Sequence, residues 1–220
     1  DGIIALMALN IAKGFEFTGK DSTDTYHKQI EAMKLAFADG QKQISDIRFM
    51  SKKPEDLLSE DLFASRRSLI GKEALEPDAL DPKTSGTIYL CTADKDGNMV
   101  SFIQSNYYGF GSGIVVPATG ISLQNRGMGF SMDPQSPNCL APRKRAFHTI
   151  IPGFITKDDK AVGPFGIMGG FMQPQGHLQI LSNMIDFSIN PQAAVDAPRL
   201  VCDGRKKVKV EKNVPSHISE

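Results

Sequence analysis

Gly86-Thr87 is a pair of residues whose types and order could do covalent chemistry. A threonine hydroxyl is a poor nucleophile unless a base lies beside it, and a threonine at a chain terminus carries that base in its own α-amino group. Self-cleavage can create such a terminus, since the hydroxyl attacks the preceding carbonyl, the amide becomes an ester, and water releases the amine. Because glycine tolerates the strained backbone that this attack requires, Gly86-Thr87 is a candidate autocleavage site with Thr87 as nucleophile.

Two glycine-rich segments could serve such a nucleophile. Met168-Gly169-Gly170-Phe171 follows an expected strand and precedes an expected helix, where paired glycines can aim backbone N–H groups into a cavity. A structural turn is the alternative interpretation of this pair. Residues 109–113 have alternating glycines but lack GxGxxG spacing and a following helix, which favours a tight corner of a sheet over a dinucleotide site.

The composition excludes several classes of protein. The 25 Lys and Arg residues balance the 25 Asp and Glu residues, so no long-range field recruits nucleic acid or an anionic membrane. No apolar run reaches the length of a membrane span. The three cysteines form no CxxC pair and the four histidines lack ligand spacing, so we expect no metal and no other cofactor. Cys91 and Cys202 are expected in the core.

The elements that would position these residues change character at the candidate cleavage site. Before it, the sequence predicts an apolar helix over residues 2–15, an amphipathic helix over 22–40 and a third helix over 59–69. Residues 73–86, EALEPDALDPKTSG, have two prolines, four acids and no periodicity. This composition predicts an exposed, flexible connector.

After Thr87 the pattern is mainly that of strands. They are expected over residues 87–94, 99–104, 113–117, 147–155 and 161–168, with a tight hairpin turn at Asp96-Gly97. A helix is expected over 177–187, a shorter helical segment from Asn190 to near Pro198, and a hairpin turn at 202–205. Helices, a connector and then strands with helices outside indicate an α+β layered domain.

Several segments together resemble the γ-glutamyltranspeptidase family of N-terminal nucleophile hydrolases. They are Thr87 with DKDGN (94–98), FGSGIVVPATGISLQN (110–125), Gly169-Gly170, NPQAAVDAPRL (190–200) and, upstream, GIIALMALNIAKGFEF and EAMKLAFADGQKQISD. The resemblance covers almost the whole chain. It implies a four-layer αββα core, an autocleaved precursor and a heterodimer. Residues 1–86 would be the helical end of the large subunit with its connector, and 87–220 the small-subunit catalytic part, with the remainder of the large subunit outside this sequence.

The resemblance also implies roles for individual residues. Thr87 matches the family's nucleophile, and Gly169 and Gly170 match the pair whose amides form the oxyanion hole. Ser105 matches a hydroxyl residue that bonds near the amine of the nucleophile. These matches support the chemistry inferred from Gly86-Thr87.

The residues that recognise the substrate depart from the family's pattern. Arg126 stands where the family has an acidic or amide group, and Gly129 stands where it has its second aspartate. His148 and Thr149 match paired serines that contact the α-carboxylate of a glutamyl group. The usual acceptors for a glutamyl α-ammonium are therefore missing. A site that binds this ammonium needs such acceptors, because an unpaired buried cation is costly. Arg126 would repel this ammonium and attract a carboxylate.

We therefore expect an N-terminal threonine amidohydrolase or acyltransferase that acts on a small-molecule amide. A γ-glutamyltransferase-like activity with hydrolysis favoured is the main hypothesis. One alternative is a glutaryl or cephalosporin acylase that accepts an acyl group without the α-amine, and another is an unprocessed, non-catalytic binding protein. The chain begins at Asp1-Gly2, as expected of a piece of a longer product. The sequence does not identify the cellular compartment, although a cytoplasmic one is favoured.

Overall fold

The computed structural model describes residues 1–77 and 86–219 of the chain. Its helices are α1 (Gly2–Ala12), α2 (Thr23–Gln43), α3 (Pro54–Leu57), α4 (Glu60–Arg67), α5 (Met172–Ile185), α6 (Pro191–Asp196) and α7 (Ser216–Ser219), with the 3-10 helices η1 (Ile47–Phe49) and η2 (Arg126–Gly129). Its strands are β1 (Thr87–Ala93), β2 (Met99–Ser105), β3 (Gly153–Lys157), β4 (Lys160–Phe165), β5 (Leu200–Cys202) and β6 (Val208–Val210). The mixed α+β class expected from the sequence is confirmed.

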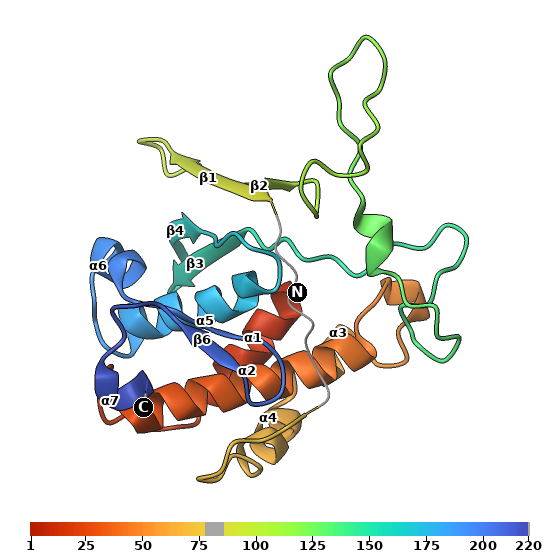
Figure 1. Ribbon diagram of the computed structural model, residues 1–220. Helices are drawn as coiled ribbons and strands as arrows, with labels where there is room; N and C mark the ends of the chain where they lie inside the picture. The colour runs from red at the N-terminus through yellow and green to blue at the C-terminus, as the bar shows by residue number, and fades with distance from the viewer. Residues whose placement is uncertain (78–85, 220) are drawn as a thin grey trace.

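The elements form a stack (Figure 1). The β1–β2 hairpin lies outermost, β3 and β4 come next, and α5, α1 and α2 follow. Contacts of β4 with β1 and β2, and of α1 with α2 and α5, agree with this order. Each sheet among the described residues has two antiparallel strands. The four-layer core implied by the family resemblance is therefore not visible in these small sheets.

The main hydrophobic core lies between the helices. Ile4 and Ile11 of α1 pack in one buried cluster with Met33 and Phe37 of α2, and α4 and α5 contribute further residues. The sequence predicts both helices, but their ends differ: α1 ends at Ala12, before the expected end at residue 15, and α2 continues past Gly40 to Gln43. Ser22 caps α2 by accepting the N–H of Thr25, which satisfies one of the unpaired donors of the first turn.

A buried ion pair on α2 fixes the start of the connector. Lys34 Nζ lies 2.6 Å from a carboxylate oxygen of Glu31, and both side chains are at most 3% exposed. Lys34 also donates to the carbonyl of Leu75 at 2.8 Å, and Glu31 accepts the N–H of Leu75 at 3.1 Å. Such hydrogen bonds are what a buried pair needs to be stable. The connector is thus anchored at Leu75, whereas the part of the expected flexible segment over 78–85 lies outside the described residues.

Helix α5 begins at Met172, five residues before the expected start at His177. The glutamines near its start are polar in sequence but buried in the fold. Gln175 accepts the N–H of Cys202 at 2.7 Å, and Gln179 accepts the N–H of Leu200 at 2.9 Å and donates to its carbonyl at 3.0 Å. These side chains bond the backbone of β5 as a neighbouring strand would, and hydrophobic periodicity does not reveal this role.

Two expected strands differ from the prediction. Residues 113–117 form only an isolated bridge between Val115 and Ser122, in a loop that projects away from the body of the molecule (Figure 1). In the expected strand over 147–155, the ladder starts only at Gly153, because the N–H of Ile151 donates to the Gln173 side chain at 2.9 Å instead.

The two cysteines expected in the core have different environments. Cys202 is buried, as expected, but the prediction for Cys91 is wrong, since this thiol is exposed. The reason is its place on the hairpin, where β1 is exposed from Leu90 to Ala93.

Candidate active site

Thr87 and Ser105 meet at the open end of the β1–β2 hairpin. They are direct cross-strand partners, and the Thr87 hydroxyl donates to Ser105 Oγ at 3.2 Å. Ser105 Oγ donates to the carbonyl oxygen of Gly86 at 3.1 Å and accepts the N–H of Tyr107 at 3.0 Å. One hydroxyl therefore connects the candidate nucleophile to the carbonyl group that precedes it.

The hairpin turn sets this pairing. Gly97 has a φ of 85°, the left-handed conformation that glycine adopts without steric cost. The Asp94 carboxylate accepts the N–H groups of Asp96 and Asn98, both at 2.9 Å, and so fixes the turn expected from the sequence. A slip of one residue in register would turn Ser105 to the opposite face of the hairpin.

The face of the hairpin that carries Thr87 also lies against the end of β4. Side chains alternate along a strand, so Tyr89 shares a face with Thr87, and its hydroxyl lies 3.0 Å from Ser101 Oγ. Ser101 donates to the carbonyl of Phe165 at 3.3 Å. A Cβ atom at Gly166 would lie 2.4 Å from the Tyr89 ring. Glycine at this position therefore permits the close approach of the two segments.

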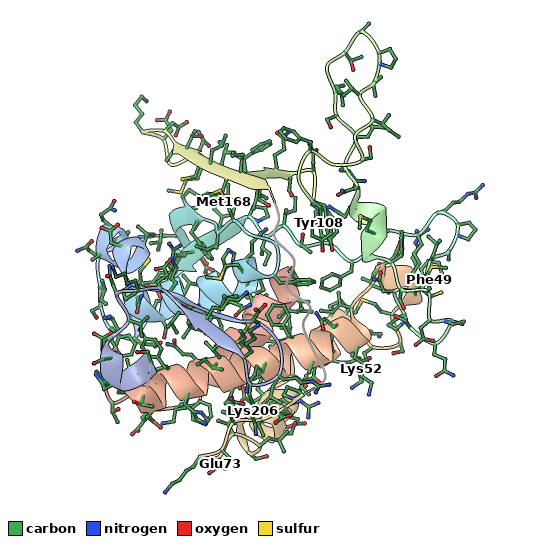
Figure 2. All side chains as sticks on the ribbon, in the orientation of Figure 1. Phe49, Lys52, Glu73, Tyr108, Met168 and Lys206 are labelled. Atoms are coloured by element: carbon green, nitrogen blue, oxygen red, sulfur yellow. The ribbon has the colours of Figure 1, made fainter. Side chains whose placement is uncertain are left out.

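Gly169 and Gly170 follow this contact on the way to α5. Their φ angles are 112° and 59°, both in the left-handed region. Their carbonyl groups accept the N–H groups of Met172 and Gln173 at 3.1 and 3.0 Å. Among the described residues, neither glycine N–H donates a backbone hydrogen bond. Met168, which precedes the pair, lies in the segment next to the β1–β2 hairpin (Figure 2).

Arg126 and Thr149, two of the three candidate substrate-binding residues, are in direct contact. Arg126 begins η2 and is 6% exposed, and its Nη1 donates to Oγ1 of Thr149, which is 1% exposed, at 2.7 Å. Its guanidinium carbon lies 5.0 Å from the centre of the Tyr107 ring. Arg126 thus points inward against an aromatic face rather than outward to a surface ion pair.

His148, the third candidate, lies beside this contact but is exposed. Although the residue as a whole is exposed, neighbouring groups shield its ring in part from water, and this desolvation and then the charge of Arg126 lower the pKa of His148. The imidazole is therefore neutral near pH 7. The carbonyl of His148 accepts the nitrogen of Asp1 at 2.8 Å, which joins this segment to the start of α1.

Tyr107 is a further candidate site residue, which the sequence interpretation missed. Its φ is 78°, an unfavourable value for an aromatic residue, and its side chain is buried. Its N–H binds Ser105, its ring lies against Arg126, and its hydroxyl accepts a hydrogen bond from Tyr108 at 3.2 Å. Tyr108 lies where the chain leaves β2 towards η2 (Figure 2). The sequence did contain a signal for this residue, namely the two adjacent tyrosines, Tyr107 and Tyr108, that follow the strand expected over residues 99–104.

Residues 1–77 and 86–219 contain neither a candidate metal site nor a candidate membrane span. No group of three His, Cys, Asp or Glu side chains there could hold a metal ion. In the same part of the chain, no helix combines the length and apolar character that crossing a bilayer requires.

Comparison with known proteins gives one family. The family model described as Gamma-glutamyltranspeptidase matches residues 1–220. Among solved structures, the chain is similar to a cephalosporin acylase from Bacillus halodurans, with 60% identity and a TM-score of 0.93 over 99% of this chain and 40% of that one.

Two curated proteins are also similar. The chain is 40% identical over 202 residues to a glutathione hydrolase-like proenzyme, YwrD, of Bacillus subtilis. The aligned region covers 91% of this chain and 38% of that relative. The chain is also 35% identical over 198 residues to an oxamate amidohydrolase proenzyme of Klebsiella pneumoniae. This aligned region covers 90% of the chain and 38% of the relative. The chain thus spans about two fifths of the length of these relatives.

Proposed function

The chain belongs to the gamma-glutamyltranspeptidase family of N-terminal nucleophile hydrolases, and from this premise we propose that Thr87 is the nucleophile of an amidohydrolase, exposed by cleavage after Gly86. The observation that carries the proposal is the hydroxyl network, in which Thr87 donates to Ser105 and Ser105 donates to the Gly86 carbonyl. The names of the two curated relatives, both proenzymes, also support a precursor that is processed.

Maturation is an acyl shift from nitrogen to oxygen. Oγ1 of Thr87 attacks the carbonyl carbon of Gly86, the bond between this carbon and the Thr87 nitrogen breaks, and the hydroxyl proton ends on that nitrogen. Ser105 assists because it accepts from the attacking hydroxyl and donates to the oxygen on which negative charge develops. Water then hydrolyses the ester, which leaves the Gly86 carboxylate and the free α-amine of Thr87.

Turnover uses the same hydroxyl. The Thr87 amine acts as general base, Oγ1 attacks the substrate carbonyl, and the leaving amine departs with a proton. The acyl group remains on Thr87 as an ester until water removes it, whereas an acceptor amine in place of water gives transfer. We assign the N–H groups of Gly169 and Gly170 to the developing oxyanion. Their positive φ angles, and the lack of other backbone acceptors for these groups among the described residues, support this role.

Two acyl groups remain candidates for the substrate. A γ-glutamyl group is the one expected from the family, and a relative named as a glutathione hydrolase-like protein supports it. The inward orientation of Arg126 against Tyr107 favours the second candidate, an acyl group without the α-ammonium, such as glutaryl. Relatives named as a cephalosporin acylase and an oxamate amidohydrolase support this candidate.

The rest of the large subunit is the proposed partner within the mature protein. Cleavage would assign residues 1–86 to the large subunit and 87–220 to the small one. Four apolar side chains on the outer face of the hairpin, Ile88, Leu90, Val100 and Phe102, are between 46% and 65% exposed. Since this chain spans about two fifths of its relatives, we propose that the remaining part of the large subunit covers this face in a heterodimer.

The proposal is tested with the full-length protein. Wild type, Thr87→Ala and the conservative Thr87→Ser are compared by intact mass, N-terminal sequencing and hydrolysis of γ-glutamyl and glutaryl p-nitroanilides. We expect a new N-terminus at Thr87 in wild type and none in Thr87→Ala. A folded wild type that stays uncut would overturn the proposal and support a non-catalytic binding protein.

A further inference from the structure

The chain directly after β2 holds a strained residue beside the proposed nucleophile. Tyr107 has a φ of 78°, and its side chain is 7% exposed. A left-handed backbone is unfavourable for an aromatic residue and persists only where the surrounding structure imposes it. The N–H of Tyr107 donates to Ser105 Oγ at 3.0 Å. The strained backbone therefore supplies one donor to the hydroxyl network proposed for cleavage.

This donor sets the direction of the Ser105 proton. A serine hydroxyl has one proton and two lone pairs. Ser105 Oγ accepts from the N–H of Tyr107 and from the hydroxyl of Thr87, so both lone pairs are used. The proton is then directed to the carbonyl oxygen of Gly86, 3.1 Å away. The donor for this carbonyl thus depends on the backbone conformation of Tyr107.

Asn125 bonds the residues on both sides of Tyr107. Its Oδ1 accepts the N–H of Tyr108 at 3.0 Å, and its Nδ2 donates to the carbonyl groups of Tyr108 at 3.2 Å and Gly111 at 3.0 Å. Its own N–H donates to the carbonyl of Asn106 at 3.1 Å. The flanking peptide groups are therefore fixed by a residue 17 positions after Tyr108.

These partners suit an asparagine at position 125. An amide group offers one acceptor oxygen and two N–H donors, which match one backbone N–H and two carbonyl groups. An aspartate has the same shape, but it would present an oxygen without a proton to both carbonyl groups. The close approach of the two segments also requires Gly111, where a Cβ atom would lie 2.3 Å from the carbonyl oxygen of Leu123.

We infer that Asn125 is a positioning residue for cleavage after Gly86, and that it acts through Tyr107 and Ser105. Within the described part of the chain, its side-chain hydrogen bonds go to the turn after β2 rather than to Thr87 or Gly86. This inference rests on the proposed function, since the orientation of Ser105 affects the rate only if Thr87 attacks the Gly86 carbonyl.

A double-mutant cycle in the full-length protein tests whether Asn125 acts through Ser105. The rate at which the Thr87 N-terminus appears is followed by intact mass, below the melting temperature of every variant. Asn125→Ala should slow cleavage by about tenfold, because the Ser105 proton loses its fixed direction. In the Ser105→Ala background the same change should cost less than about twofold, since its target is gone. An equal loss in both backgrounds, or none in either, would overturn the inference.

The control for a general loss of stability is Asn190→Ala. Asn190 accepts the N–H of Ala193 at 2.9 Å at the start of α6, and its removal should leave the cleavage rate unchanged. Asn125→Asp keeps the acceptor oxygen and removes both donors. It should also slow cleavage, and it replaces Asn125→Ala if that variant does not fold.

A structural measurement decides on the contact without any cleavage. Crystal structures of the uncut Thr87→Ala precursor are compared with and without Asn125→Ala or Asn125→Asp. We expect Tyr107 to leave the left-handed region and its N–H to lose Ser105 Oγ. A Tyr107 that keeps both features would overturn the role of Asn125. Wild type that stays uncut, or Ser105→Ala that cleaves at the wild-type rate, would instead reject the proposed function or the role of Ser105 in it.

Discussion

The hydroxyl groups of Thr87 and Ser105 lie 3.2 Å apart as cross-strand partners, with the Ser105 hydroxyl directed at the carbonyl of Gly86. A hairpin therefore brings together, from residues 18 positions apart, an attacking oxygen and a donor for the carbonyl that it would attack. This arrangement depends on strand register alone, and it requires no side chain from the helices.

Ser105 is expected to act in both maturation and turnover. Ser105→Ala removes the donor to the Gly86 carbonyl, and loss of one such donor typically costs about 100-fold or more in rate. The rate of appearance of the Thr87 N-terminus, followed by intact mass, measures the effect. Ser105→Thr keeps the hydroxyl and should retain much of the rate. Ser101→Ala is a control on the same face of β2. Cleavage of Ser105→Ala at the wild-type rate would contradict the proposed role of Ser105.

Gly169 is expected to be intolerant of any side chain. Its φ is 112°, and a Cβ atom would lie 3.1 Å from Cβ of Met172. Gly169→Ala should therefore displace the N–H groups assigned to the oxyanion and lower kcat by about 100-fold or more. A bulky residue at Gly170, which is buried, should also lower kcat by orders of magnitude.

Gly97→Ala provides the matched control for backbone strain. Gly97 has a φ of 85° with open space around its Cβ position, and it lies at the hairpin turn, away from Thr87. The variant should lower the melting temperature but leave kcat unchanged. If Gly169→Ala behaves like Gly97→Ala in steady-state kinetics, the oxyanion assignment is wrong.

Substrate preference is expected to shift towards γ-glutamyl when the charge near Tyr107 is reversed. Arg126→Gln combined with Gly129→Asp removes the cation and adds a carboxylate next to Tyr107 Oη, where a Cβ atom has ordinary contact distances of 3.7 and 3.8 Å. The ratio of kcat/KM for γ-glutamyl and glutaryl anilides should rise by about tenfold or more, since an ammonium gains a partner.

Arg126→Gln with Gly127→Asp is the control for this exchange. Gly127 lies in the same turn, but its Cβ position has no neighbour within 4 Å. A carboxylate there should not reach Tyr107. An equal gain in both double variants would indicate a general electrostatic effect rather than a contact with the substrate ammonium.

His177 is expected to make the protein sensitive to acid. This residue is 2% exposed, its ring lies 4.7 Å from that of Phe165, and burial lowers its pKa to about 4. The unfolded chain takes up the proton near pH 6.5 and the folded protein only near pH 4, so stability is lost as the pH falls through this window. The loss amounts to about 3 kcal/mol at its low end. Melting temperatures of wild type and His177→Gln between pH 7 and 4.5 measure it.

The expected outcome is a weaker pH dependence for His177→Gln than for wild type. His217→Gln, which removes an exposed histidine, should not change the slope. Parallel curves for wild type and His177→Gln would show that other groups cause the loss of stability.

The sequence by itself predicted the main helices and indicated a candidate nucleophile. Gly86-Thr87, the Asp96-Gly97 turn and the alternation along β1 depend on neighbouring residues, so short-range rules were sufficient to predict the hairpin and α2. The family resemblance also followed from local motifs, and the match to residues 1–220 confirms it. The sequence did not determine the hydrogen-bond partners of buried polar groups.

Those partners are decided by tertiary structure. Arg126 and Thr149 are 23 positions apart, and an arginine in sequence is equally compatible with a surface ion pair. Gln175 and Gln179 appear polar, yet they are buried because the backbone of β5 supplies their hydrogen bonds. Burial of a polar side chain costs free energy unless a distant group satisfies it. Only the fold shows that group, and for this reason a candidate nucleophile could be proposed from the sequence, whereas the inward position of Arg126 could not.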